Sequence, residues 1–210
     1  MGNIVISSMR VGLFQTNCYF IHKEGSTDTI VVDPGDRAES IYEEVVRQNL
    51  NVVAILLTHG HFDHILGVKE FKAKTHAKVY AGADEAELLK DPAINASERV
   101  RRPEIIIPDV LLNDKEKVNI ADLSFEVIFT PGHTQGSVCY YFKEAGILIS
   151  GDTLFEESVG RCDFPTGSES ALLASITERL MVLPDETNVY PGHGAMTTIG
   201  NERKYNTFIN

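Results

Sequence analysis

The sequence predicts a single α/β domain with a layered sheet core, and three observations support this fold class. Its 210 residues suit one well-packed domain. The composition, with 43% hydrophobic and 23% charged residues, is typical of a soluble globular protein. Short apolar runs alternate with helical patterns, and no Pro/Ser-rich linker or low-complexity tract divides the chain. We therefore expect residues 1–210 to form one domain.

The first half of the chain predicts four strands and three helices. Strands are expected where apolar runs end in turn residues, at 4–7, 18–22, 29–33 and 52–57. The last run is almost wholly apolar, as in a strand covered on both faces. Helices are expected at 38–48, at 83–89 and at 64–72, where Asp63 occupies the capping position.

The second half of the chain also alternates predicted strands with predicted helices. Strands are expected at 123–129, 137–142, 146–150 and 188–190. A helix is expected at 169–181, and one or two helical turns near the end of the sequence. Residues 90–109 show neither the hydrophobic period of a strand nor that of a helix, so we expect them to cross the surface as a long loop.

The charge balance restricts the expected partners and compartment. The chain has 19 basic and 30 acidic side chains, a formal net charge of −11 and a pI near 5.0. This argues against nucleic acid or an anionic membrane as a partner, although a local positive site is compatible with it. No apolar run approaches the roughly 18–20 residues that span a bilayer, and the first residues lack a basic region followed by an apolar one. We expect a cytoplasmic protein.

Cysteines and histidines are used differently. Cys18, Cys139 and Cys162 are widely separated and form no C-x-x-C pair, which predicts small buried side chains rather than disulfides or a thiolate zinc site. The histidines instead cluster, while His22 and His76 lie outside this pattern and are interpreted as ordinary surface or half-buried residues.

Five apolar runs are each followed at once by polar residues able to bind a metal ion. The runs lead into Asp33, into His59-Gly60-His61, into His133, into Asp152 and into His193. Ligand-binding groups in sheet folds gather in loops at strand ends, where a rigid scaffold holds them. The repetition therefore indicates one shared site.

The segment from His59 to His64 is the densest of these signals. Imidazole and carboxylate groups bind zinc or iron at about 2.0–2.2 Å. His59 and His61 would project the same way from an extended loop, whereas Asp63 and His64 at a helix start would face a neighbouring position. The alternative is a set of ordinary histidines or a purely structural metal. Taken by themselves, His133 and His193 would be interpreted as ordinary histidines. Taken together with the 59–64 cluster, they and Asp152 are the expected remaining ligands.

Four motifs carry a family resemblance over nearly the whole chain. Thr-His-Gly-His-Phe-Asp-His at 58–64, Thr-Pro-Gly-His-Thr at 130–134, Ser-Gly-Asp-Thr-Leu at 150–154 and Pro-Gly-His-Gly at 191–194 resemble the metallo-β-lactamase superfamily. Gly-Asp-Thr-Leu-Phe at 151–155 and Gly-Arg-Cys-Asp-Phe at 160–164 look like its glyoxalase II (hydroxyacylglutathione hydrolase) branch and the related persulfide dioxygenases. True β-lactamases often have cysteine where this chain has Asp152. The resemblance implies a four-layer αβ/βα sandwich.

The resemblance also implies roles for the site residues. His59, His61 and His133 would hold one divalent ion, Asp63, His64 and His193 a second, and Asp152 would bridge them. Zinc is the expected metal, with iron or manganese as alternatives. Asp33 would either support a ligand loop or act only as a turn residue. Arg161 and Asp163 could line the pocket or form a structural ion pair, and the ion pair is the favoured role because an arginine beside carboxylates is usually paired.

The implied activity is hydrolysis of a small-molecule thioester, such as an anionic hydroxyacyl thiol, by a metal-bridging hydroxide. Asp63 would be the catalytic residue that ligates its metal and orients the hydroxide. The alternatives are an iron-dependent persulfide dioxygenase and a non-catalytic binding module of the same fold. Only 17 residues follow His193, so the C-terminal region that holds glutathione in glyoxalase II is not expected, and specificity would depend on residues 90–109 and 154–167.

Overall fold

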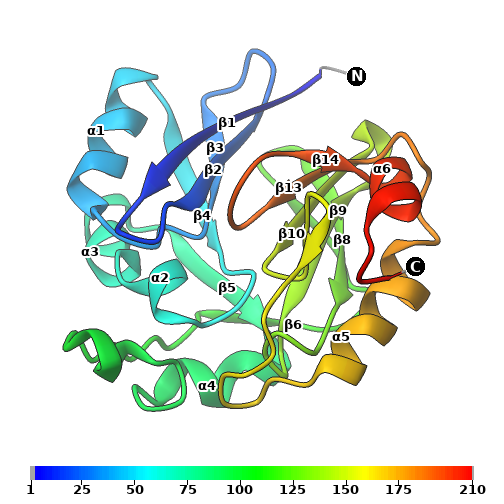
Figure 1. The fold of residues 1–210 in the computed structure, drawn as a ribbon. Coiled ribbons are helices and arrows are strands. Elements are labelled where there is room, and N and C mark those ends of the chain that lie inside the picture. The colour runs from blue at the N-terminus through cyan, green and yellow to red at the C-terminus, as the bar shows by residue number, and fades with distance from the viewer. Residues whose placement is uncertain (1–2, 210) are drawn as a thin grey trace.

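Two six-stranded sheets face each other across an apolar core in the computed structural model, which describes residues 3–209 (Figure 1). The first sheet has the order β1 (Ile4–Val11), β2 (Thr16–Lys23), β3 (Asp28–Val32), β4 (Asn51–Leu56), β5 (Lys78–Gly82), β6 (Val110–Leu112). The second has the order β14 (Thr197–Thr198), β13 (Asn188–Pro191), β10 (Ile147–Gly151), β9 (Val138–Phe142), β8 (Leu123–Phe129), β7 (Lys117–Ile120). A small hairpin, β11 (Leu154–Phe155) with β12 (Ser158–Val159), lies beside the second sheet.

Strand direction changes within each sheet. Strands β1, β2 and β3 are antiparallel, whereas β3 to β6 run parallel. The second sheet is antiparallel apart from the β10–β13 pair. The carboxyl ends of β3 and β4 therefore lie at one edge of the first sheet, and those of β10 and β13 at one edge of the second.

Helices cover the outer face of each sheet, which completes four layers. In β2, Cys18 and Phe20 pack outward with α1 (Ala38–Arg47) and α3 (Val68–Thr75), while Tyr19 and Ile21 point into the core between the sheets. This alternation follows from the two-residue period of a strand. On the other side, α5 (Glu169–Ser175) and α6 (Ile199–Tyr205) cover the second sheet (Figure 1). The expected αβ/βα sandwich is confirmed.

The expected helix over 64–72 is wrong as a single element. The chain forms α2 (Phe62–Ile65) and then α3, which are separated at Leu66 and Gly67. The backbone N–H of Gly67 donates to the Pro34 carbonyl at 3.1 Å, which diverts the chain there. Asp63 is not a cap, because α2 starts one residue before it and no side chain caps this helix. Its carboxylate is instead directed to the site described below.

Other differences from the sequence expectations concern short elements. Strands β5, β6 and β7 were not expected, because they are short and β5 is only partly apolar. The expected helix at 83–89 begins as a 3₁₀ turn, Ala83–Glu85, and continues as α4 (Ala86–Lys90). The helix expected to 181 changes to π geometry at Ile176–Leu180. The long loop after α4 contains one 3₁₀ turn, Ser97–Val100.

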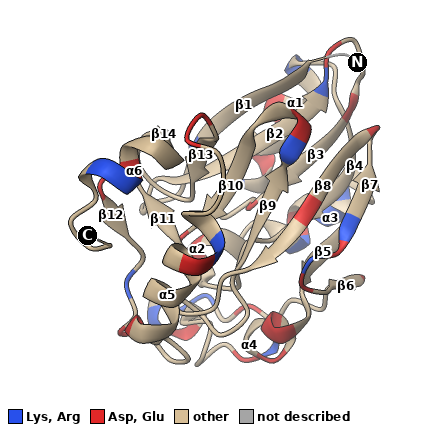
Figure 2. Ribbon diagram, turned by 90° about the vertical axis from the view of Figure 1, so that its right-hand side faces the viewer, with Lys and Arg blue, Asp and Glu red and all other residues tan. Residues whose placement is uncertain are grey.

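Charged residues of both signs are interspersed over helices, strand ends and loops (Figure 2). Within residues 3–209, no helix has the length and apolar character needed to cross a membrane. Cys18 and Cys139 are buried and Cys162 is half-buried, and all three are free thiols, as expected.

Candidate metal centre

The five polar segments that follow apolar strands meet at one edge of the sandwich. Asp33 follows β3 and the 59–64 segment follows β4, both in the first sheet, while His133, Asp152 and His193 follow β8, β10 and β13 in the second. Apart from Asp33, their side chains fall into three groups, and within each group the potential ligand atoms lie within 4.8 Å of one another. The candidate site is thus built jointly by both sheets.

The first group is a set of three buried histidines, which we call the inner triad: His59, His61 and His133. Each is 1–2% exposed. The His133 Nε2 lies 2.8 Å from His61 Nδ1 and 3.2 Å from His59 Nε2. Nitrogens bound tetrahedrally at about 2.0–2.1 Å from one zinc ion lie about 3.3 Å apart. The inner triad therefore has nearly the spacing that a single ion requires.

The second group is the outer triad, which consists of Asp63, His64 and His193. The Asp63 Oδ2 lies 3.2 Å from His193 Nε2 and 3.8 Å from His64 Nε2. Its burial is uneven, because the side chain of His64 is fully buried, that of Asp63 is 15% exposed and that of His193 is 27% exposed. Solvent therefore reaches this side of the centre.

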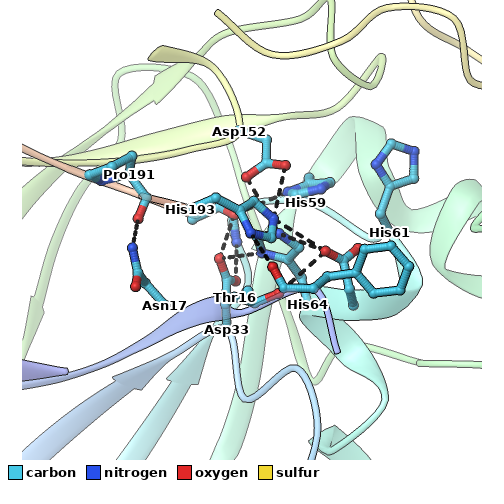
Figure 3. Close-up of polar contacts among 12 residues, drawn as sticks. Thr16, Asn17, Asp33, His59, His61, His64, Asp152, Pro191 and His193 are labelled. Carbon is cyan, nitrogen blue, oxygen red and sulfur yellow. Dashed lines mark hydrogen bonds and ion pairs between the residues drawn. The ribbon is translucent and has the colours of Figure 1, made fainter. Parts of the chain in front are cut away.

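Asp152 lies between the two triads. Its Oδ1 is 3.4 Å from His64 Nε2, and its Oδ2 is 3.5 Å from His193 Nε2 and 3.7 Å from His133 Nε2 (Figure 3). A Cβ at Gly192 would lie 2.1 Å from Asp152 Oδ1, so only glycine fits beside this carboxylate. Asp152 thus has the position of a ligand shared by two ions.

Hydrogen bonds outside the centre determine which ring nitrogens face into it. His133 Nδ1 donates to the Arg161 carbonyl at 2.7 Å, and His193 Nδ1 donates to the Phe14 carbonyl at 3.0 Å. Because a carbonyl only accepts, Nδ1 of each ring carries a proton, and Nε2 is the nitrogen that faces the centre. His64 Nε2 and Asp152 Oδ1 are buried without a hydrogen-bond partner. Metal ions would satisfy both atoms, so these residues fit a metal centre.

Asp33 supports the ligands directly. It accepts hydrogen bonds from the Thr58 N–H at 2.8 Å, from the Thr58 hydroxyl at 2.6 Å and from His64 Nδ1 at 2.9 Å. Of the two roles that the sequence left open, the structure favours support of the ligand loop over a plain turn. Arg161 and Asp163 form the expected ion pair at 2.6 Å, and both side chains are exposed.

The two triads differ in their electrostatics. Burial lowers the pKa of His61 to about 3 and also lowers the pKa of His59 and His133, so the inner triad is neutral at pH 7. Burial opposes charge on His193 too, but hydrogen bonds to Asp152 and Asp63 raise its pKa to about 9. In the metal-free protein the outer triad therefore holds a proton that an ion must displace.

Three supporting residues carried no sequence signal. Glu85 accepts hydrogen bonds from the loops beside the inner triad. The Asn17 side chain donates to the carbonyls of Pro191 at 3.0 Å and Gly194 at 3.1 Å, and Thr16 donates to Asp63 Oδ2 at 3.3 Å (Figure 3). Glu85 is isolated from any motif, and the partners of Asn17 lie more than 170 residues away in the sequence, so only the folded chain reveals these contacts.

Comparison with known families agrees with this geometry. The sequence model of the metallo-beta-lactamase superfamily matches residues 11–193, which include both triads and Asp152. The chain belongs to the metallo-β-lactamase superfamily. Members of this superfamily are metal-dependent hydrolases, and the present chain has a His/Asp cluster able to bind metal.

Relatives within the superfamily span the whole chain. A probable metallo-hydrolase of Bacillus subtilis, YqgX, is 39% identical, with 96% of each chain covered. The hydroxyacylglutathione hydrolase GloC of Haemophilus influenzae is 32% identical, with 98% of each chain covered.

Solved superfamily structures resemble it closely. The BLEG-1 B3 metallo-beta-lactamase has a TM-score of 0.93 at 39% identity, covering 98% of this chain and 99% of that one. TTHA1623 in a di-iron-bound form has a TM-score of 0.86 at 34% identity, covering 96% and 99%. ETHE1 from Myxococcus xanthus has a TM-score of 0.81 at 27% identity, covering 97% and 83%.

Proposed function

We propose that this chain is a binuclear metallohydrolase that cleaves a small thioester such as a hydroxyacyl thiol. The observation that carries the proposal is the pair of adjacent triads that share Asp152, because it provides seven ligands for two ions: His59, His61, Asp63, His64, His133, Asp152 and His193. The hydroxyacylglutathione hydrolase among the relatives supports the thioester class. Zinc is the proposed metal, with iron or manganese as alternatives.

When bound, two divalent ions would polarise the thioester carbonyl and lower the pKa of a shared water toward about 7. The side chains of the site would orient the attacking water and hold the ligand rings in place. Asp63, which accepts a hydrogen bond from Thr16, is the proposed catalytic residue because its carboxylate faces the partly exposed side of the centre and can orient the attacking water. Asp33 and the Phe14 and Arg161 carbonyls would keep the ligand rings in their binding orientation.

A cavity beside Asp63 supports a small substrate. It encloses about 120 Å³ and is lined mainly by apolar side chains of the β1–β2 turn, of α2 and of the 97–100 turn, with Arg102 at its polar side. Arg102 already pairs with Asp36 at 3.0 Å. The space suits a short acyl group next to the reacting centre.

The test combines metal analysis with a substrate panel. The purified protein is assayed for bound metals and for hydrolysis of thioesters that include lactoylglutathione, with a β-lactam added because BLEG-1 is a B3 metallo-beta-lactamase. We expect two ions per chain and thioester cleavage. Asp63→Ala should reduce turnover about a hundredfold while leaving the circular dichroism spectrum unchanged. Wild-type turnover in a folded Asp63→Ala variant would remove Asp63 from the mechanism.

The persulfide dioxygenase alternative rests on the ETHE1 neighbour. One iron per chain with oxygen uptake on a persulfide would favour it over the hydrolase. A protein that binds both ions yet turns over nothing in the panel would favour a non-catalytic binding module.

A further inference from the structure

Glu85 is a buried carboxylate that the proposed hydrolysis does not use. It ends the 3₁₀ turn after β5 and is 1% exposed. Its Oε1 accepts a hydrogen bond from the Gly60 N–H at 2.7 Å, and its Oε2 accepts from the Thr134 hydroxyl and the Gly136 N–H, each at 3.0 Å. All three donors belong to loops that carry ligands of the inner triad.

These two loops come from different sheets. Gly60 lies between His59 and His61 after β4 of the first sheet, and Thr134 follows His133 after β8 of the second. The carboxylate therefore connects a loop of the first sheet to a loop of the second. The outer triad has no bond to Glu85 and is supported instead by Thr16, Asp33 and the Phe14 carbonyl.

One of the ligand loops packs closely against Glu85. A Cβ at Gly136 would lie 2.2 Å from the Glu85 backbone nitrogen, so only glycine fits at this point of the loop. Burial outweighs the hydrogen bonds that Glu85 receives and raises its pKa to about 7, so placing a carboxylate here is unfavourable for folding alone. The three donors that this carboxylate pairs with all belong to the ligand loops, which indicates that it serves the site.

We propose that Glu85 is a positioning residue for the inner triad, and that it determines the affinity of that triad for its metal ion without contacting the ion. The inference rests on the two-ion centre proposed above but not on its substrate. Supporting residues outside the ligand set typically change metal affinity by roughly tenfold to a hundredfold. The effect should be confined to one of the two metal positions.

The experiment is a metal titration of Glu85→Gln with Glu202→Gln as the matched control. Glu202 is also fully buried and also accepts from a threonine hydroxyl, Thr197 at 2.6 Å, and from a backbone N–H, that of Glu157 at 2.8 Å. Metal-free proteins are titrated with Co²⁺ and Zn²⁺ against a competing chelator, and the two positions are assigned by the Co²⁺ spectra of His61→Ala and His193→Ala.

We expect Glu85→Gln to weaken the inner position roughly tenfold to a hundredfold and to leave the outer position within about twofold of wild type. Equal weakening of both positions, an unchanged inner affinity or the same loss in Glu202→Gln would overturn the proposal. If Glu85→Gln does not fold, Thr134→Val removes one of its three donors and should give a smaller loss at the same position. Absence of thioester turnover in a protein with normal metal affinities would refute the proposed function but not this inference.

Discussion

The inner and outer triads use similar ligands in different surroundings. Every inner histidine is 1–2% exposed and neutral, whereas the outer triad includes His193, whose side chain is 27% exposed and whose pKa is raised to about 9. Burial thus prepares the inner triad for an ion, while the outer triad must release a proton and remains open to solvent. We therefore expect the inner position to bind its ion more tightly and the outer position to exchange more readily.

The two triads are also held in place by different supporting groups. Glu85 joins two loops at the inner triad. At the outer triad, Asn17 at the start of β2 and the Phe14 carbonyl in the β1–β2 turn contact the loop that carries His193. Each triad is therefore supported by its own side chains, and the two proposed metal positions should respond separately to substitution.

The largest expected effect comes from Asp152, which is the residue that the triads share. Asp152→Ala should weaken both metal positions and reduce kcat/KM about a thousandfold on the substrate identified in the panel. Bound metal measured after dialysis, together with steady-state kinetics, checks this. Asp122→Ala, an exposed aspartate in the β7–β8 turn, is the control. Loss at only one position would mean that Asp152 is not shared.

The next effect is on the pH dependence of stability in the metal-free protein. The pKa of Glu85 is raised from 4.5 to about 7, so its contribution to stability is complete below about 4.5 and is lost as the pH rises through 7. Wild type should lose roughly 3 kcal/mol relative to Glu85→Gln over this window. Urea unfolding at several pH values measures the difference, and parallel curves would contradict the prediction.

A smaller effect is expected at Asn17. Asn17→Ala removes two hydrogen bonds to the His193 loop and should weaken the outer position roughly tenfold, with the inner position unchanged. Isothermal titration with Zn²⁺ measures the affinities of the inner and outer positions separately. The matched control is Asn51→Ala, which removes an exposed hydrogen bond to Asp28. Equal weakening of both positions would show that the triads are not supported separately.

The smallest effect is expected at Arg161. Its backbone carbonyl, not its guanidinium, holds His133, and its side chain forms only an exposed pair with Asp163. Arg161→Ala should therefore keep the inner metal affinity within about twofold of wild type in the same titration. A larger loss would mean that the side chain also positions the loop.

The meeting of the candidate ligand residues could be predicted because the segments that carry them each follow an apolar strand, so local sequence order encodes where they lie. His59, His133, Asp152 and His193 all follow this rule. Glu85 could not be predicted in this way, because its three partners come from loops that only folding brings together. The missed strand β6 has three residues and pairs along one side only, so its local pattern is too short to indicate a strand.

The division of ligands between two sheets gives bound metal a second consequence. Positions 59 to 64 lie on the first sheet and positions 133, 152 and 193 on the second, so an ion at either triad would tie the two halves of the chain together. Because such ions bind the folded chain and not the unfolded one, their binding free energy would add to the stability of the folded protein. A chelator would then destabilise the protein by removing a link between two parts of the chain that are far apart in the sequence.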